Sequence, residues 1–341
     1  MQDTMQVIMA KAGSDAKEKD AFYLKQEPIP NPHAKDLLIR VQAIAMNPVD
    51  TKVRQLTDAD KVLGWDCYGV IEQIGSEANG FKTGDTVFYA GDITRPGCNS
   101  EYHLVDYRIT SLAPKKLSAA DAVAMPLTSI TAWEGLFDRL GFTAKANANQ
   151  GKSILIIGGA GGVGSVAIQL ARWSGIEVIA TASRPETIAW CQKLGANSTI
   201  NHRNNLKEEL QANGSDFVDA IFCTTQMEKH WQAMAECIRP QGSVVLIDDP
   251  TEPVDITAFK TKSVSLSWEF MYTRSMFQTA DIAKQGELLA TVAQLLDEGT
   301  LQTTRQRTLQ GLSPENIQDM HHLQESGTML GKQVLVLENS T

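Results

Sequence analysis

The chain lacks several features that would place it in other classes of protein. No run approaches the roughly 20 consecutive apolar residues that a membrane-spanning helix needs. The N-terminus lacks the basic segment and long apolar stretch of a secretory signal. The 5 cysteines are scattered and form no CxxC pair, which argues against a disulfide framework or a structural zinc knuckle. We therefore expect a protein of the reducing cytoplasm with no membrane partner.

The charge of the chain also excludes a class of partners. Lys and Arg together number 31 against 40 Asp and Glu, so the formal net charge is −9, and no basic run occurs. Nucleic acid and anionic membrane surfaces are poor partners for such a protein. At 341 residues the chain is too long for one ordinary core, so we expect two domains.

Short strands separated by turns characterise the first third of the chain. Residues 36–45 (DLLIRVQAIA) have the composition of a strand, and residues 67–74 and 86–90 follow with glycine-containing turns between them. A further short strand is expected at 101–105. This pattern indicates a compact β-rich domain.

The pattern changes near Ser118, where apolar residues take up helical spacing. From Lys152 the chain alternates between fully apolar strands, such as SILIIGG, and amphipathic helices, such as GVGSVAIQLARWSG. Apolar strands of this kind occur in parallel sheets that are covered on both faces. The β-α-β-α series therefore predicts an α/β fold with a doubly wound parallel sheet.

The segment GAGGVG follows the first apolar strand and opens a helix, which is the context in which a GxGxxG motif indicates a dinucleotide site. The first glycine is expected to permit the tight turn, the second to let a pyrophosphate approach the backbone, and the third to bring helix and strand together. The helix start offers N–H groups and a positive dipole end to the phosphates. A glycine-rich turn without ligand is the alternative. The predicted cofactor residues are Gly159, Gly161, Gly162, Val163 and Gly164.

The end of the second strand of this series bears on the choice of nicotinamide cofactor. An NAD site places Asp or Glu about 20 residues after the glycines, but residues 181–184 read TASR, without an acid. Ser183 and Arg184 can instead hold a 2′-phosphate, through charge-assisted bonds worth roughly 1.5–3 kcal/mol. We therefore predict NADPH rather than NADH. A second role for Ser183, compatible with the first, is to cap the helix that begins at Pro185.

Six segments recur along the chain in a characteristic order and spacing. They are NPVDT (47–51), GWDCYGVIEQIG (64–75), FKTGDTV (81–87), MPLTSITAW (125–133), the glycine loop and GKQVL (331–335). Together they resemble the medium-chain dehydrogenase/reductase superfamily, in particular its quinone oxidoreductase branch and the zinc-type alcohol dehydrogenase-like members, along nearly the whole chain. The resemblance implies a GroES-like β domain formed by residues 1–125 and 262–341, with a Rossmann NADPH-binding domain of residues 126–261 inserted between its parts. It also implies a homodimer or homotetramer.

The resemblance also implies functional positions. Asn47 and Asp50 are expected beside the nicotinamide. Thr128 is expected against the nicotinamide ring or its ribose, and Lys332 near the pyrophosphate. Each has a plainer alternative. Asn47 and the proline after it form an ordinary turn dipeptide. Thr128 can bond back within its own helix, and Lys332 can be a solvated strand lysine.

Zinc-dependent relatives use a Cys in the early loop, a His in a Gly-His-Glu segment and a later Cys or Asp. Here Asn47 or a neighbour stands where the Cys would be, and Trp65 replaces the imidazole. The lobe that holds four cysteines around a structural zinc is reduced to residues 91–100 and contains only Cys98. The histidines His103, His202 and His230 are scattered along the sequence. We therefore expect no metal.

Two further positions belong to this comparison. Many quinone reductases have Tyr two residues after the Asp, where this chain has Lys52. A phenol at that place is therefore not the proton donor here. Asp66 follows Trp65 and could interact with Lys52 or Arg54.

Without a Lewis acid, reduction of a simple ketone loses its main source of oxyanion stabilisation. A quinone or an α,β-unsaturated carbonyl spreads the incoming charge by its own electronics. We therefore expect hydride transfer from NADPH to such an acceptor.

A zinc-free alcohol or aldehyde reductase and a non-enzymatic, crystallin-like NADPH-binding protein remain alternatives. Candidates for catalysis are Asn47, Asp50 and Tyr272, and candidates for the pocket wall are Trp65, Tyr68 and Phe270, with core packing as the alternative for the aromatic residues.

Overall fold

The structure, a computed structural model, describes residues 3–337 and divides into two compact units. The first, here called the β-rich unit, contains the chain up to Ile130 and again from Tyr272 onward. The second, here called the α/β unit, contains Thr131–Met271. The predicted fold class, a β-rich domain interrupted by a parallel α/β domain, is confirmed.

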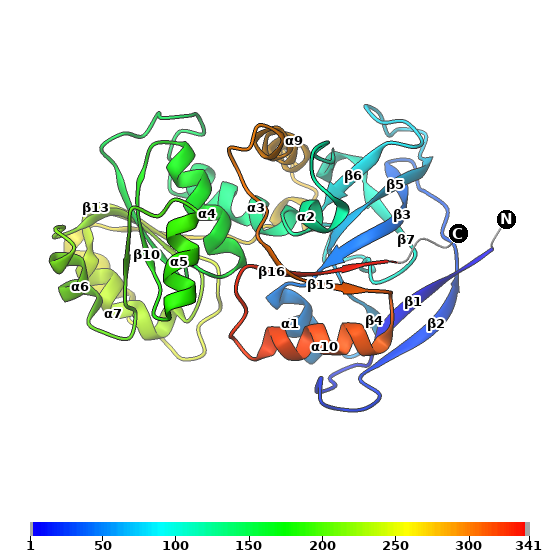
Figure 1. The fold of residues 1–341 in the computed structure, drawn as a ribbon, viewed down its shortest axis with the longest axis horizontal. Helices are drawn as coiled ribbons and strands as arrows, with labels where there is room; N and C mark the ends of the chain where they lie inside the picture. The colour runs from blue at the N-terminus through cyan, green and yellow to red at the C-terminus, as the bar shows by residue number, and fades with distance from the viewer. Residues whose placement is uncertain (1–2, 338–341) are drawn as a thin grey trace. The chain divides into compact units, whose positions relative to one another are not determined.

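Two sheets form the framework of the β-rich unit (Figure 1). The smaller sheet has the order β2-β1-β4 and is antiparallel. The larger has the order β15-β16-β3-β5-β6-β8, and β7 also pairs with β3. In this order the C-terminal strand β16 lies directly beside β3 and so brings the end of the chain to its early strands. The strands are β1 (Thr4–Ala10), β2 (Phe22–Pro28), β3 (Asp36–Ala45), β4 (Lys61–Val62), β5 (Asp66–Ile74), β6 (Thr86–Tyr89), β7 (Tyr102–Asp106), β8 (Thr110–Leu112), β15 (Arg305–Gln310) and β16 (Lys332–Val336).

Helices of the β-rich unit lie against these sheets. The dipeptide at Asn47, which could be read as a turn, starts a helix instead, because Pro48 suits a first helical position and Asn47 an N-cap. This helix, α1, lies beside α10 (Figure 1). The helices are α1 (Pro48–Leu56), α2 (Ala119–Val123), α8 (Thr273–Met276), α9 (Lys284–Asp297), α10 (Pro314–Glu325) and a 3₁₀ turn at Tyr107–Ile109, and α3 (Pro126–Trp133) begins in this unit.

The α/β unit contains a six-stranded sheet in the order β11-β10-β9-β12-β13-β14, with every pair parallel. The predicted doubly wound parallel sheet is thus confirmed. Of the helices described between residues 3 and 337, none is long and apolar enough to cross a bilayer. The strands are β9 (Ser153–Ile157), β10 (Glu177–Thr181), β11 (Ser198–Ile200), β12 (Val218–Cys223), β13 (Ile238–Leu246) and β14 (Ser265–Trp268); the helices are α4 (Gly162–Trp173), α5 (Pro185–Lys193), α6 (Leu206–Ala212) and α7 (Met227–Cys237), with a π-helix at Glu134–Arg139 and a 3₁₀ helix at Ile256–Lys262.

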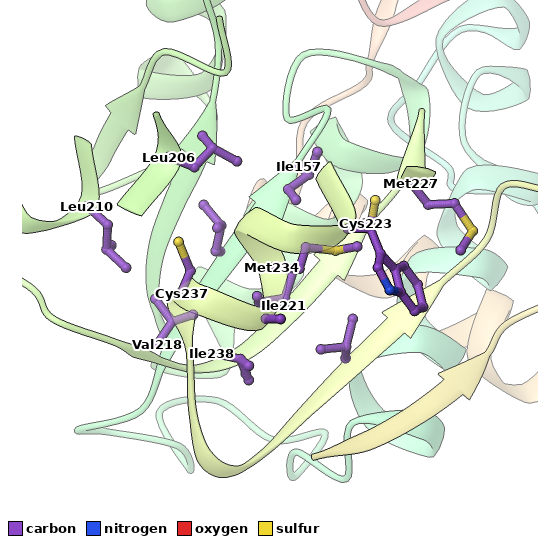
Figure 2. Packing of buried hydrophobic residues seen from close by; sticks show 14 of the residues in the cluster. Ile157, Leu206, Leu210, Val218, Ile221, Cys223, Met227, Met234, Cys237 and Ile238 are labelled. Carbon is purple, nitrogen blue, oxygen red and sulfur yellow. The ribbon is translucent and has the colours of Figure 1, made fainter. Parts of the chain in front are cut away.

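One large apolar core holds the sheet of the α/β unit against α6 and α7 (Figure 2). Ile221 of β12 lies in it with Leu206 and Leu210 of α6 and Met234 of α7. Full burial of each such side chain stabilises the fold by roughly 1.5–3 kcal/mol. Ile157, the last residue of β9, belongs to the same cluster. The core therefore holds in place the strand end from which the glycine loop starts.

The α/β unit spans Thr131–Met271, whereas the predicted range of the Rossmann domain was 126–261. Residues 126–130 group with the β-rich unit, where the N–H group of Leu127 bonds to Asp66. Residues 262–271 group with the α/β unit because β14 pairs in parallel with β13. Strand β14 therefore groups with the α/β unit, whereas the range implied by the resemblance places residues 262–271 in the GroES-like domain.

Candidate functional site

The turn after β9 contains glycines that the protein itself requires. Gly158 has a φ of +83°, and an added Cβ would lie 2.4 Å from Thr224 Oγ1, so Gly158 rather than Gly159 makes the tight turn. At Gly159 an added Cβ would come within 2.8 Å of Ala180 Cβ, so this glycine permits close packing instead. At Gly164 the same atom would lie 2.3 Å from the carbonyl oxygen of Gly158. Helix α4 can approach the strand this closely only without a side chain there, as predicted for Gly164.

Gly161 differs because the protein's own packing does not require a glycine there. It is the N-cap of α4 with an ordinary φ of −73°, and an added Cβ would meet only the Gly158 carbonyl oxygen, at 3.5 Å. No side chain caps this helix start, at which Gly162 and Val163 are the first two residues. Open space beside exposed backbone at a helix N-terminus fits the pyrophosphate of a dinucleotide. The loop therefore has the form that a nicotinamide cofactor needs.

Strand β10 ends beside this loop. The hydroxyl of Thr181 accepts a hydrogen bond from the Gly158 N–H group at 3.0 Å. Arg184, not Ser183, is the N-cap of α5, because Pro185 occupies the first helical position. The expectation that Ser183 caps this helix is therefore wrong, and its side chain is left to other contacts. The Arg184 guanidinium pairs with Glu186 at 2.8 Å.

Two basic residues near Arg184 were missed at the level of sequence. His202 and Arg203 follow β11, the strand next to β10. Burial lowers the pKa of His202, and the nearby charges of Arg203 and Arg184 lower it further. Basic side chains from two neighbouring strand ends therefore gather at one place. The sequence does contain a pattern that predicts this, since His202 and Arg203 come shortly after the apolar end of a strand.

A second polar group lies inside the β-rich unit, where the starts of α1, β5 and β16 meet. Asn47, Asp66 and Lys332 are only 1, 0 and 3% exposed. The Lys332 Nζ donates to the carbonyl oxygen of Met46 at 2.6 Å, to Asp66 Oδ2 at 2.9 Å, and to Asn47 Oδ1. Three acceptors match the three N–H groups of an ammonium ion. The contact with a pyrophosphate that the resemblance implies for Lys332 would compete with these bonds.

Asp66 connects several elements. Its Oδ2 accepts from Asn47 Nδ2 at 2.8 Å as well as from Lys332, and its Oδ1 accepts from the N–H group of Leu127 at 2.7 Å. Leu127 is the second residue of α3, so Asp66 satisfies a donor at the start of that helix from strand β5. The ion-pair partner of Asp66 is Lys332, and Arg54 is paired with Glu325.

Asp50 lies at the third position of α1. Its carboxylate accepts from the Asn47 N–H group at 2.7 Å and from the Gly64 N–H group at 2.9 Å. It thereby ties the start of α1 to the residue before Trp65. Burial raises the pKa of Asp50 to about 7, although the bond to the Asn47 N–H group and the charge of Lys332 lower it. This carboxyl therefore changes its charge near neutral pH.

Two aromatic residues lie in the same unit. The rings of Trp65 and Tyr272 meet edge to face, with centroids 6.1 Å apart. The Trp65 Nε1 donates to the carbonyl oxygen of Asp92 at 3.2 Å, and both aromatic side chains are buried. Burial, followed by the nearby charges of Asp50 and Asp66, raises the pKa of Tyr272 well above its usual value. The phenol therefore keeps its proton and can act as a donor.

The remaining predicted residues lie elsewhere. The Thr128 hydroxyl donates to the Met125 carbonyl oxygen at 3.1 Å, which is the back-bond within the helix that we gave as its alternative. Tyr68 is half-buried on β5 and packs against an apolar cluster that includes Val334. Phe270 is 46% exposed on the α/β unit. Within the β-rich unit the structure therefore groups Asn47, Asp50, Trp65, Tyr272 and Lys332, and adds Asp66.

The donor atoms in this region do not suit zinc. Within residues 3–337 no group of three or more His, Cys, Asp and Glu side chains is arranged to hold a metal ion. Zinc prefers thiolate and imidazole ligands in tetrahedral geometry. Here the Trp65 Nε1 is a donor bonded to the Asp92 carbonyl oxygen, and the Asp66 and Asn47 oxygen atoms already bind an ammonium ion. Burial raises the pKa of Cys98 well above its usual value, so it remains a thiol, and it donates to the Asp66 carbonyl oxygen.

Comparison with known proteins places these features in a family context. Residues 33–115 match the model of the alcohol dehydrogenase GroES-like domain, and residues 162–284 match that of the zinc-binding dehydrogenases. A zinc-type alcohol dehydrogenase-like protein of Staphylococcus aureus (strain MSSA476) is 42% identical over 321 residues, which cover 94% of this chain and 96% of that relative.

Two other relatives have names that specify an acceptor. The quinone oxidoreductase of Pongo abelii is 30% identical over 272 residues, covering 76% of this chain and 78% of its own length. A 2-methylene-furan-3-one reductase of Solanum lycopersicum is 35% identical over 241 residues, covering 66% of this chain and 58% of its own length. Among solved structures, a Rhizobium etli CFN 42 protein provisionally named a zinc-dependent alcohol dehydrogenase superposes with a TM-score of 0.93 at 44% identity, covering 98% of this chain and 99% of its own.

The two glycines of the loop provide a matched pair of variants. Gly161→Ala should weaken NADPH binding by roughly tenfold or more, because the added methyl group occupies the space proposed for the pyrophosphate. Its free energy of unfolding should change by less than about 1 kcal/mol. Gly164→Ala should instead lower that free energy by roughly 1–3 kcal/mol, because it overpacks the helix against the strand. Fluorescence titration and urea unfolding measure both. Equal loss of binding and stability in both variants would contradict the assignment.

Asp50→Asn should flatten the dependence of stability on pH. Native Asp50 keeps its proton up to a pKa of about 7, whereas an unfolded Asp loses it near pH 4. Between these values the native state binds more protons, so the free energy of unfolding of the wild type falls as pH rises. The Asn side chain does not titrate and lacks this contribution. Urea unfolding at about pH 5 and about pH 8 measures the difference, and an unchanged difference in the variant would refute the shift.

Proposed function

The chain belongs to the medium-chain dehydrogenase/reductase superfamily, and we propose that it is a zinc-independent oxidoreductase that transfers a hydride from NADPH to a quinone or an α,β-unsaturated carbonyl. One observation carries the proposal. The Lys332 ammonium is bound to Met46, Asn47 and Asp66, so the oxygen atoms of these three residues already have a cation. The names of relatives that reduce a quinone or an enone support the acceptor class.

The acceptor class follows from the absence of suitable metal donors among these residues. A simple carbonyl needs strong stabilisation of the developing oxyanion, which a Lewis acid commonly supplies. A quinone or enone delocalises the incoming electron pair over its own conjugated system. The acceptor gains a hydride and a proton, while NADPH is converted to NADP⁺. The protein then has to orient the acceptor, exclude water and provide a proton or a hydrogen bond.

We assign these tasks to residues of the β-rich unit. Tyr272 keeps its phenolic proton and is proposed to donate a hydrogen bond to the acceptor oxygen. Asp50, with a pKa of about 7, is proposed to release or take up a proton at neutral pH. Asn47 holds Asp66 and Lys332 and keeps its proposed place beside the nicotinamide. Trp65 supports Tyr272 from within the unit. Tyr68 is proposed as a residue of the pocket wall, whereas Phe270, which belongs to the α/β unit, stays a prediction from the sequence.

The α/β unit is proposed to bind the cofactor, which supplies the hydride when bound. Gly161, Gly162 and Val163 present open backbone at the start of α4 to the pyrophosphate. Gly159 and Gly164 make that approach sterically possible. Thr128 stays a proposed nicotinamide contact.

The 2′-phosphate of NADPH is proposed to bind near the ends of β10 and β11. Arg184 lies there with Ser183, and the charges of Arg184 and Arg203 both reach His202. Basic groups from two strand ends favour a phosphate over the bare ribose hydroxyl of NADH. Glu186 now pairs with Arg184 and would have to release it.

A homodimer is proposed for the assembly. Strand β14 lies at one end of the six-stranded sheet, in the part of the chain that the structure describes. Trp268 at its end is 55% exposed and Phe270 is 46% exposed. An unpaired strand edge with exposed aromatic residues can pair with the same edge of a second copy. Light scattering that gives the mass of two chains would support this assembly.

A panel of acceptors tests the proposed activity. With NADPH, quinones and enones should be reduced with a kcat/KM roughly 100-fold or more above that of simple aldehydes, because a conjugated acceptor does not need a Lewis acid. NADPH oxidation followed by absorbance measures this. Equal or faster turnover of aldehydes would favour an alcohol or aldehyde reductase. Cofactor binding without turnover of any acceptor would favour a non-enzymatic NADPH-binding protein.

Arg184→Ala should lower kcat/KM for NADPH by roughly 10- to 150-fold, the equivalent of one charge-assisted bond of about 1.5–3 kcal/mol. The value for NADH should hardly change. Glu186→Gln is the matched control, because it removes the competing carboxylate and should leave NADPH preference equal or higher. Comparable kcat/KM values for the two cofactors in the wild type would refute the predicted preference.

A further inference from the structure

The surroundings of the Lys332 Nζ have the form of a small cation-binding site. Its acceptors are the Met46 carbonyl oxygen at 2.6 Å, Asp66 Oδ2 at 2.9 Å, and Asn47 Oδ1. They come from the end of the loop before α1 and from the start of β5, whereas the lysine comes from β16. All the side chains in this group are almost completely buried. The lysine therefore joins segments that are remote in the sequence at a place closed to water.

The geometry requires a charged amine. A neutral amine has two N–H groups and a lone pair, whereas three acceptors surround this nitrogen. The carboxylate of Asp66 provides the opposite charge, with its other oxygen bonded to the Leu127 N–H group. Removal of one partner from a buried ion pair is strongly destabilising, because it leaves the other charge without compensation. The cation is thus part of what holds Asp66, and through it the start of α3, in position.

We propose that Met46 O, Asn47 Oδ1 and Asp66 Oδ2 form a binding site for a primary ammonium ion, which Lys332 fills from within the chain. Lys332 is therefore a positioning residue that acts through Asp66 and Asn47. The inference concerns the chain's own cation and holds whichever acceptor the enzyme reduces.

Shortening of Lys332 should convert this internal arrangement into a site for an external ligand. Lys332→Ala removes three carbon atoms and the ammonium group, which together correspond to n-propylammonium. The oxygen atoms stay on the loop before α1 and on β5, and they face the vacated space. A primary ammonium ion of this length can restore three hydrogen bonds, whereas tetramethylammonium has the same charge but no N–H group.

The experiment uses the full chain with Lys332→Ala. Its Tm should fall by roughly 5–10 °C relative to the wild type, and kcat with NADPH and the best acceptor should fall more than KM rises. Addition of n-propylammonium chloride should recover at least half of both losses, and tetramethylammonium chloride at equal ionic strength should recover neither. Lys284→Ala is the control, since Lys284 is exposed and pairs with Asp281 only at 3.8 Å. It should change neither quantity.

Several results would overturn the inference. One is a Tm of Lys332→Ala equal to that of the wild type. Another is equal recovery of Tm and kcat with the two ammonium salts. A third is one tightly bound zinc per wild-type chain whose removal lowers the Tm as much as the substitution does. If Lys332→Ala does not fold, Lys332→Met keeps an apolar stem of similar length and removes the ammonium group with its charge and its three N–H donors. A Tm in that variant equal to the wild type would also refute a required cation. Failure of the acceptor panel would leave the Tm recovery unaffected, so the two proposals can fail separately.

Discussion

The buried pair of Asp66 and Lys332 is the interaction on which the candidate catalytic region depends. Asp66 accepts hydrogen bonds from Asn47, Leu127 and Lys332, and so joins the starts of α1, α3 and β16 to the start of β5. Desolvation of a carboxylate and an ammonium is costly, so such a pair persists only where further hydrogen bonds satisfy both groups. Here each of the three ammonium N–H groups and both carboxylate oxygens have partners. Activity and local stability are therefore expected to respond together to changes at these residues.

The α/β unit follows a different constraint, which is steric. Its apolar core positions the end of β9, and Gly158, Gly159 and Gly164 then bring α4 close to that end. Gly161, by contrast, is free of contacts that exclude a side chain. A glycine that packing does not require, at a helix start without a capping side chain, is better explained by a ligand than by the fold. We therefore propose that cofactor binding and folding use different glycines of one short loop.

Much of the fold could be predicted from local patterns. Strand β3 matches its predicted range, 36–45, and the series from β9 to α5 follows the expected order, because apolar periodicity and glycine punctuation act within a few residues. The prediction was less good where structure depends on remote partners. β14 was placed outside the parallel sheet, although its pairing with β13 makes it the sixth strand. At Asn47 and Pro48 the sequence left a turn and a functional site as alternatives. The helix α1 that begins there is held by Asp50, which also accepts from the N–H group of the more distant Gly64.

The segment GWDCYG shows where local sequence information ends. Its residues alone are sufficient to predict the strand that follows Trp65. They do not reveal that Asp66 pairs with a lysine 266 positions further along the chain. Nor do they reveal that His202 and Arg203 lie near Arg184, since β10 and β11 must pair before their ends meet. A motif depends on residues that are neighbours in the chain, so the sequence determines it. Ion pairing and pKa shifts depend on burial and on distances through space, and both are set only once the chain has folded.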